Sequence, residues 1–295
     1  MVGMALLPGP VLASTVYIDA NHLEIFEGDT VLFSVRIDSE SKNINAVEGE
    51  VVLDHEAGTV SLIDISTSGS QFSLWPRTPL PSERNTRISF TGGSPGGFVS
   101  KDAIIFNLAL KFNKAGLVSL SPDTIKVYLH DGKGTEDQVQ VKDVLLNVLP
   151  KKPDTKPADD WNTILSNDTI APEPFEIYVG QDNSVFDGKK FLSFNTTDGQ
   201  SGISYYEVFE GDRPPIRSNN TYVLQEQNKP VKVTVIAYDS AGNTREAVYS
   251  ITLDTVPSFS ILILIGTVLL LSIVLFIIVY KKKRKRKLKN ERNET

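Results

Sequence analysis

Side chains that could carry out catalysis are few in this sequence and lie far apart. The chain has three histidines, His22, His55 and His130, and no cysteine, so disulfide bonds, thiolate nucleophiles and cysteine-bound zinc are excluded. It contains no HExxH zinc motif and no P-loop for nucleotide phosphates. Paired carboxylates such as Asp54 and Glu56 could act on glycosides, although solvated charges on a strand and its turn explain them as well. A Ser/His/Asp set assembles only in space, which leaves that option open, but the sequence predicts a protein that is not an enzyme.

One acidic loop could hold a structural calcium ion. In the segment HDGKGTED at residues 130–137, Asp131, Thr135 and Asp137 offer the hard oxygen ligands that calcium prefers. The spacing differs from that of an EF-hand, and Lys133 places a positive charge in the middle. A plain glycine turn is therefore the competing interpretation. No other cofactor is expected.

Aromatic side chains are the candidates for sugar binding, because their flat faces can stack on sugar rings. Phe72 and Trp75 lie in the segment FSLWPR, between two predicted strands, and loops carry function more often than strands do. Phe98 and Tyr128 are further candidates. The alternative is that Trp75, followed by a proline, plugs the open end of a sandwich.

Residues 15–148 alternate apolar and polar side chains in short runs, which predicts β-strands. Residues 30–38 and 103–112 show this alternation with β-branched and aromatic side chains. Glycine-rich turns are expected between the runs, at GGSPGG (92–97) and DGKG (131–134) among others. With about nine such strands and no amphipathic helix, we expect a two-sheet sandwich of the jelly-roll kind.

A proline-rich segment separates this region from a second β region. Residues 149–173 contain the run PKKPDTKPADD, which starts at Pro150, and have few apolar side chains, which predicts an extended linker. From 174 to 255, six or seven strand-like runs such as VKVTVIAYD predict a sandwich of immunoglobulin or fibronectin type III size. The predicted fold class is therefore all-β, with two β-sandwiches followed by one transmembrane helix.

Both ends of the chain suggest export and anchoring. Residues 1–14 look like the remnant of a signal peptide, apolar and ending in a cleavable V-L-A pattern. Residues 259–280 carry no charge and reach about 33 Å as a helix, so we expect a single span at 257–280. The basic residues that follow predict a cytoplasmic tail at 281–295 by the positive-inside rule. They are Lys281, Lys282, Lys283, Arg284, Lys285 and Arg286. The expected location is the cell membrane, with the bulk of the chain at the cell surface.

The order of motifs in residues 15–148 resembles the cohesin family. These motifs are EGDTVLFSV (27–35), NINAVEGEVVLD (43–54) and AIIFNLALKFNKAG (103–116). The resemblance implies the jelly-roll fold of bacterial carbohydrate-binding modules and a partner of the dockerin type. It also places Asn45 and Glu48 on the contact strand. Ala46 stands where the family's asparagine is expected, so the chain departs from the pattern there.

The second region is similar to bacterial Ig-like and fibronectin-type repeats. The similar segments are DGQSGI (198–203) and AYDSAGN (237–243). In many surface proteins such a module is a spacer, and the turn chemistry of SAGN agrees with that. The resemblance therefore implies that this module supports the first one.

The charges are distributed unevenly along the chain. Residues 281–295 hold nine of the 30 Lys and Arg residues and two of the 36 Asp and Glu residues, which leaves residues 1–280 strongly acidic. Such a surface repels nucleic acid, so that class of partner is excluded.

These features predict a membrane-anchored, extracytoplasmic binding protein. Its cohesin-like domain would recognise a carbohydrate or a dockerin-type protein module, in the context of polysaccharide catabolism. The first alternative is a structural envelope, surface-layer or adhesion protein without a small-molecule ligand. The second is the sensor half of a signalling system, which would depend on a partner because the tail has no room for a signalling domain.

Overall fold

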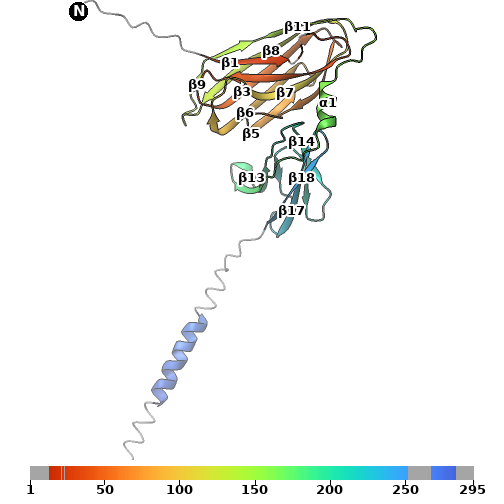
Figure 1. Ribbon diagram of the computed structural model, residues 1–295. Coiled ribbons are helices and arrows are strands. Elements are labelled where there is room, and N and C mark those ends of the chain that lie inside the picture. Colours follow the sequence, from red (N-terminus) through yellow and green to blue (C-terminus); the bar gives the residue numbers. More distant parts are fainter. Residues whose placement is uncertain (1–12, 21, 23, 252–266, 284–295) are drawn as a thin grey trace, which may run out of the picture. The chain divides into compact units, whose positions relative to one another are not determined.

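The computed structural model describes residues 13–20, 22, 24–251 and 267–283 (Figure 1). The predicted signal segment lies almost entirely outside these residues. Two compact units are present, one made of residues 1–227 and 231–250 and the other of 228–230 and 251–295. The first unit contains both β-sandwiches, and its structure is mostly β.

The first sandwich consists of two sheets. The first has the strand order β10-β1-β2-β7-β4, and the second has the order β11-β8-β3-β6-β5 with β9 paired to β8. All pairs are antiparallel except β1 with β10. The strands of the first sheet are β10 (Val139–Lys142), β1 (Ser14–Ala20), β2 (Thr30–Asp38), β7 (Ala103–Phe112) and β4 (Val60–Ser66). Those of the second are β11 (Val144–Val148), β8 (Gly116–Leu129), β3 (Ile44–His55), β6 (Arg87–Phe98), β5 (Leu74–Pro81) and β9 (Glu136–Asp137).

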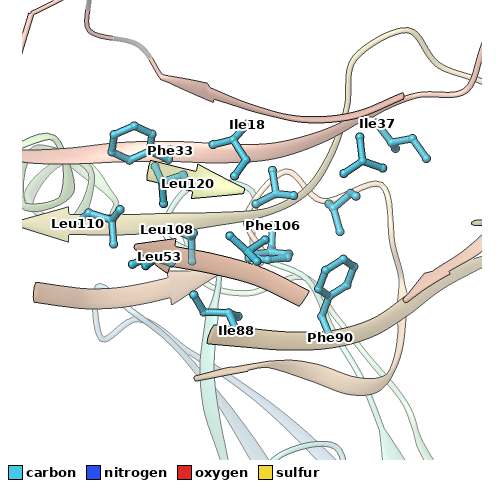
Figure 2. Close-up of a cluster of buried hydrophobic side chains, with 14 of the residues drawn as sticks. Ile18, Phe33, Ile37, Leu53, Ile88, Phe90, Phe106, Leu108, Leu110 and Leu120 are labelled. Atoms are coloured by element: carbon cyan, nitrogen blue, oxygen red, sulfur yellow. The ribbon is translucent and has the colours of Figure 1, made fainter. Parts of the chain in front are cut away.

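Alternation along the strands produces one apolar core between the two sheets. On β2, the alternate residues Val31, Phe33, Val35 and Ile37 are all fully buried, as expected for a strand with one face on the core. Figure 2 shows side chains from both sheets meeting in this core. The ring centroids of Phe90 on β6 and Phe106 on β7 lie 5.0 Å apart, edge to face, which stabilises the contact between the sheets.

The predicted turn at residues 92–97 is wrong, because these residues belong to strand β6. A Cβ atom on Gly92 would lie 2.6 Å from the ring of Trp75, and one on Gly93 would lie 2.6 Å from the carbonyl oxygen of Asn45. Both glycines are therefore needed for close packing inside a sheet, whereas the sequence pattern favoured chain reversal.

A bulge in β8 shapes the middle of the second sheet. Glu48 pairs with Lys126 and Glu50 pairs with Asp123, so β8 carries one more residue than β3 between these pairs. Gly49 lies at this point with φ +155°, and a Cβ there would lie 2.6 Å from Ile125 Cδ1. Glycine at position 49 thus allows the bulge.

The segment after the first sandwich docks back onto it. Ala158 donates its N–H to Asp29 Oδ1 at 2.8 Å, and its carbonyl accepts from Thr30 N at 2.8 Å. Helix α1 (Asp160–Asn167) follows, with its first-turn Asn162 N–H capped by Asp159, and its Trp161 side chain is buried. The sequence predicts an extended linker here, whereas the structure shows a partly helical segment held by specific bonds.

The second sandwich pairs a three-stranded sheet, β12-β13-β16, with a four-stranded sheet, β15-β14-β17-β18. The strands of the smaller sheet are β12 (Ile177–Asp182), β13 (Val185–Phe194) and β16 (Thr221–Val223). Those of the larger sheet are β15 (Ile216–Ser218), β14 (Ile203–Glu210), β17 (Val231–Asp239) and β18 (Thr244–Ile251). All their pairings are antiparallel, and the number of strands agrees with the sequence prediction.

In the second unit, residues 267–283 form a helix whose apolar side chains are exposed. No helix among the described residues is both long and apolar enough to cross a membrane. Residues 257–266 of the predicted span lie outside the described part of the chain. Lys281, Lys282 and Lys283 end the helix, and Arg284, Lys285 and Arg286 also lie outside that part.

Candidate functional site

The outer surface of the second sheet gathers charged side chains in rows. Inward residues of β3 such as Val47 are fully buried, so Glu48 and Glu50 lie on the opposite face. Glu48 is opposite Lys126 of β8 on one side and Thr91 of β6 on the other, and Arg77 of β5 is opposite Thr91. One row, Lys126–Glu48–Thr91–Arg77, therefore crosses four strands. We call the surface formed by these four residues together with Glu50, Arg87, Ser89, Asp123 and Tyr128 the β3 face.

Neighbouring side chains hold Glu48 in place. The Tyr128 hydroxyl donates to Glu48 Oε1 at 2.8 Å, and Lys126 Nζ lies 3.7 Å from the same oxygen. The hydrogen bond to Glu48 raises the pKa of Tyr128, since the bond favours the protonated phenol. Glu48 thus keeps a defined orientation while remaining half-exposed.

A second charge cluster lies one row further along. Arg87 Nη1 donates to Glu50 Oε2 at 2.7 Å and to Asp123 Oδ2 at 3.1 Å, and Ser89 Oγ donates to Glu50 Oε1 at 3.0 Å. The hydrogen bonds to Glu50 and Asp123 raise the pKa of Arg87. The β3 face therefore presents alternating charges in a fixed array.

The structure brings Asn45 and Glu48 to the same end of β8. Asn45 Nδ2 lies 3.0 Å from Nδ1 of His130, just beyond β8, while Glu48 is bonded to Tyr128 within it. A register shift between Ile44 and Ala46 separates Asn45 from the regular part of β3. Of the two sequence-predicted contact residues, Glu48 thus belongs to the β3 face and Asn45 borders it.

Phe72 and Trp75 are packed into the core of the first sandwich. Their exposed fractions are 1% and 6%, and their ring centroids lie 5.5 Å apart. Phe72 also contacts Phe98, with ring centroids 5.7 Å apart. The predicted loop position of Trp75 is wrong, because this residue lies in strand β5. The burial of both rings leaves neither as an open platform. Both rings nevertheless border a pocket, described below.

The residues of the predicted calcium loop separate into two groups. Asp131 accepts from Thr135 Oγ1 and from Lys133 N, and the Thr135 bond is the larger cause of the lowered pKa of Asp131. Asp137 instead accepts from Lys42 Nζ at 2.6 Å and from Ser14 Oγ at 2.7 Å. Burial alone would raise the pKa of Asp137, but these bonds lower it. Asp137 is therefore paired with an ammonium group, and calcium at this loop remains a prediction.

A carboxylate cluster that the sequence did not reveal lies in the second sandwich. Asp168, Asp198 and Asp239 are all buried, and one oxygen of each lies within 4.8 Å of the others. Asp198 Oδ1 accepts the N–H of Ser201 at 2.9 Å, and Asp239 Oδ1 accepts the N–H of Asn243 at 2.7 Å. Hard oxygen atoms at this separation could hold a divalent cation. The turns around Asp198 and Asp239 are visible in the sequence, but Asp168 comes from the end of α1 and carries no signal of its own.

No protein-family model matches this chain, and no curated protein matches it. Solved structures do match. Cohesin modules are among them. The non-cellulosomal cohesin of the archaeon Archaeoglobus fulgidus is 15% identical, with 47% of this chain and 92% of that chain covered and a TM-score of 0.38.

Two bacterial cohesins give similar values. A type I cohesin of Clostridium thermocellum, solved in complex with a dockerin, is 10% identical over 50% of this chain and 99% of that chain, with a TM-score of 0.39. The cohesin module of a family 33 glycoside hydrolase from Clostridium perfringens is 14% identical over 47% of this chain and 98% of that chain, with a TM-score of 0.39. About half of the chain is thus similar to cohesin modules, as the sequence predicts.

Proposed function

We propose that this chain is a non-catalytic binding protein that uses its β3 face to hold a dockerin-type protein module. The observation that carries the proposal is the exposed row Lys126–Glu48–Thr91–Arg77, which crosses four strands and contains the contact residue predicted from the sequence. The dockerin would be part of a separate protein acting on polysaccharide.

The β3 face has the chemistry of a protein interface. Its carboxylates Glu48, Glu50 and Asp123 already accept hydrogen bonds from Tyr128, Ser89 or Arg87, so less side-chain freedom is lost when a partner binds. Leu74 on β5 is 51% exposed and Leu145 on β11 is 72% exposed. Because β5 and β11 are the two edge strands of the second sheet, apolar side chains flank the charges at both edges. A mixture of apolar and fixed polar groups is typical of specific interfaces.

Charge reversal at the centre of the β3 face tests the proposal. The full chain is immobilised and titrated with type I dockerins of the kind found in the cohesin complexes. We expect Glu48→Arg to raise Kd by about tenfold or more. The positive charge it introduces would be buried in the interface against the positive dockerin group that Glu48 is proposed to bind. The matched control is Glu246→Arg, at an exposed position of β18 in the second sandwich, which should leave Kd unchanged. Equal binding by both variants, or no dockerin binding by the wild-type chain, would contradict the proposal.

We also propose that residues 257–280 anchor the chain in the cell membrane, with the sandwiches on the outer side. The uncharged run at 259–280 and the basic cluster after it support this proposal. The full chain should remain with membranes after alkaline carbonate extraction and be released by detergent. Protease added to intact cells should digest the sandwiches. Release by carbonate alone would contradict anchoring, and protection from protease would contradict the orientation.

A further inference from the structure

Within the first compact unit, a pocket of about 230 Å³ lies between the first sandwich and the second. The first sandwich contributes the end of β4, the rings of Phe72 and Trp75, and part of β5. The second contributes residues 195–197, the start of β14, and Asn219 and Asn220. No residue that lines this pocket is charged, although 22% of the chain is.

Hydrogen bonds fix the walls of the pocket. Asn195 Nδ2 donates to the carbonyl oxygen of Ser73 at 2.7 Å, and Asn220 Nδ2 donates to that of Trp75 at 3.1 Å. These two amides from the second sandwich therefore hold the Phe72–Trp75 segment of the first from both of its ends. A pocket formed in advance costs less ordering when a ligand binds.

Several polar groups in the pocket remain available for a ligand. The side chains of Thr67, Thr78, Thr197, Ser204 and Asn219 line it, and none of them makes a hydrogen bond to another described residue. Apolar and aromatic surface lies beside them. The pocket thus offers hydroxyl and amide groups next to apolar carbon, without any net charge.

We propose that this pocket binds a neutral carbohydrate. Sugar hydroxyls match the free hydroxyl and amide groups, and the C–H faces of the ring match the apolar wall. The absence of cationic groups from the lining argues against phosphorylated or carboxylated ligands, which need charged partners. A volume below the roughly 300–1,000 Å³ of drug-sized sites fits about one sugar unit of a longer glycan.

An extended peptide fits this pocket less well. A peptide binds most simply by adding a strand to a sheet edge. Two edge strands line the pocket: β4 contributes only its end, at Ile65, and the longer contribution comes from β5, which contains Pro76, Pro79 and Pro81. Proline has no N–H to donate, so these residues interrupt the backbone pairing that a peptide would need.

The test uses the full chain, produced in a host without N-glycosylation and kept in a polyoxyethylene detergent. Maltoside and glucoside detergents are avoided because their headgroups belong to the proposed ligand class. An array of neutral and acidic oligosaccharides identifies the best ligand, and calorimetric titration gives its Kd. We expect a neutral gluco-, xylo-, manno- or galacto-oligosaccharide to bind, and acidic counterparts of the same length to bind at least about tenfold more weakly, which corresponds to about 1.4 kcal/mol.

A pocket-filling variant locates the site. Ser204→Tyr should weaken binding by about tenfold or more, whereas Ser193→Tyr, at an exposed β13 position outside the pocket, should bind like wild type. Asn219→Ala removes one free amide at an exposed position and should weaken binding by about threefold or more. If Ser204→Tyr unfolds at a lower temperature than wild type, the Kd of Asn219→Ala is used in its place to locate the site.

Three results would overturn the proposal. They are retention of no neutral glycan, equal affinity for neutral and acidic glycans, and unchanged binding in the folded pocket variants. Because Glu48→Arg does not alter this pocket, loss of dockerin binding and loss of glycan binding can be distinguished.

Discussion

The β3 face of the first sandwich and the interior of the second use carboxylates in opposite ways. The first displays Glu48 and Glu50 on its β3 face, paired with basic side chains at the surface. The second buries Glu210 and Asp198, and their partners include backbone N–H groups. The same residue types are therefore available to a partner on the β3 face and are enclosed by the fold in the second sandwich. Substitutions should separate these roles, since a buried acceptor costs far more to remove than an exposed one.

The largest effect is expected at Glu210 in the second sandwich. Its side chain is 1% exposed and accepts from the Tyr222 hydroxyl at 2.9 Å, from Gln225 N at 2.9 Å and from Arg213. Glu210→Ala should lower the free energy of unfolding of this sandwich by about 3 kcal/mol, because it leaves buried donors without an acceptor. Urea unfolding read by hydrogen exchange in β14 and β17 measures this. Glu246→Ala is the control and should change it by less than about 0.5 kcal/mol.

Alkaline pH should also lower the free energy of unfolding of the second sandwich. Burial is the main cause that raises the pKa of Tyr206 to about 12. Because the folded pKa exceeds the unfolded value of 10.0, the stabilisation is complete below pH 10 and is lost as pH rises toward 12. The loss should approach roughly 2 to 3 kcal/mol. Unfolding free energies at pH 9 and pH 11.5 measure it, and a Tyr206→Phe variant with the same loss would contradict this origin.

A smaller effect is expected at Asp198. Its Oδ1 accepts the N–H groups of Gln200, Ser201 and Gly202, at 3.0, 2.9 and 2.9 Å. Asp198→Ala should cost about 2 kcal/mol because these donors lose their acceptor. Asp198→Asn keeps an acceptor and should cost less than half as much by urea unfolding. Equal losses would show that the negative charge, rather than the acceptor, is what matters.

The smallest effect on stability is expected on the β3 face. Arg87→Ala breaks the bonds to Glu50 and Asp123 at the surface, so the midpoint of thermal unfolding should not move measurably. Dockerin affinity should nevertheless fall, because Glu50 and Asp123 lose their fixed orientation. A clear drop in the midpoint would show that the β3 face is built for stability instead.

Local patterns predicted most of the fold. The period of two in β2 and β7 reflects burial of alternate side chains, so these strands were predictable from neighbouring residues. The β6 glycines were not, because their role depends on Trp75 and Asn45, which are distant in sequence. Trp161, buried at the start of α1, was missed because the surrounding prolines and charges suggest an extended chain.

The candidate sites also differ in whether they depend on residues close together in the sequence or on residues far apart. Glu48 could be named from the family resemblance because one strand carries the motif, and its role as a contact residue stays a prediction. The pocket and the Asp168, Asp198 and Asp239 cluster were not found, because each is assembled from three or more separate segments. Trp75 was singled out as an aromatic residue in a loop, but only packing shows that its ring belongs to the core and borders a pocket.

The docked segment after the first sandwich has a mechanical consequence. Tension that passes along the chain from α1 to this sandwich arrives first at Asp160, which accepts from Leu32 N and lies 2.9 Å from His22 Nε2. It then reaches Asp159 and Ala158, which are joined to Thr30 and Asp29. These bonds would carry the load before any strand of the jelly roll did. If they yielded, the residues between Leu149 and Ala158 would lengthen while the β3 face stayed folded. The segment would then extend under load and limit the force that reaches the β3 face and a partner bound to it.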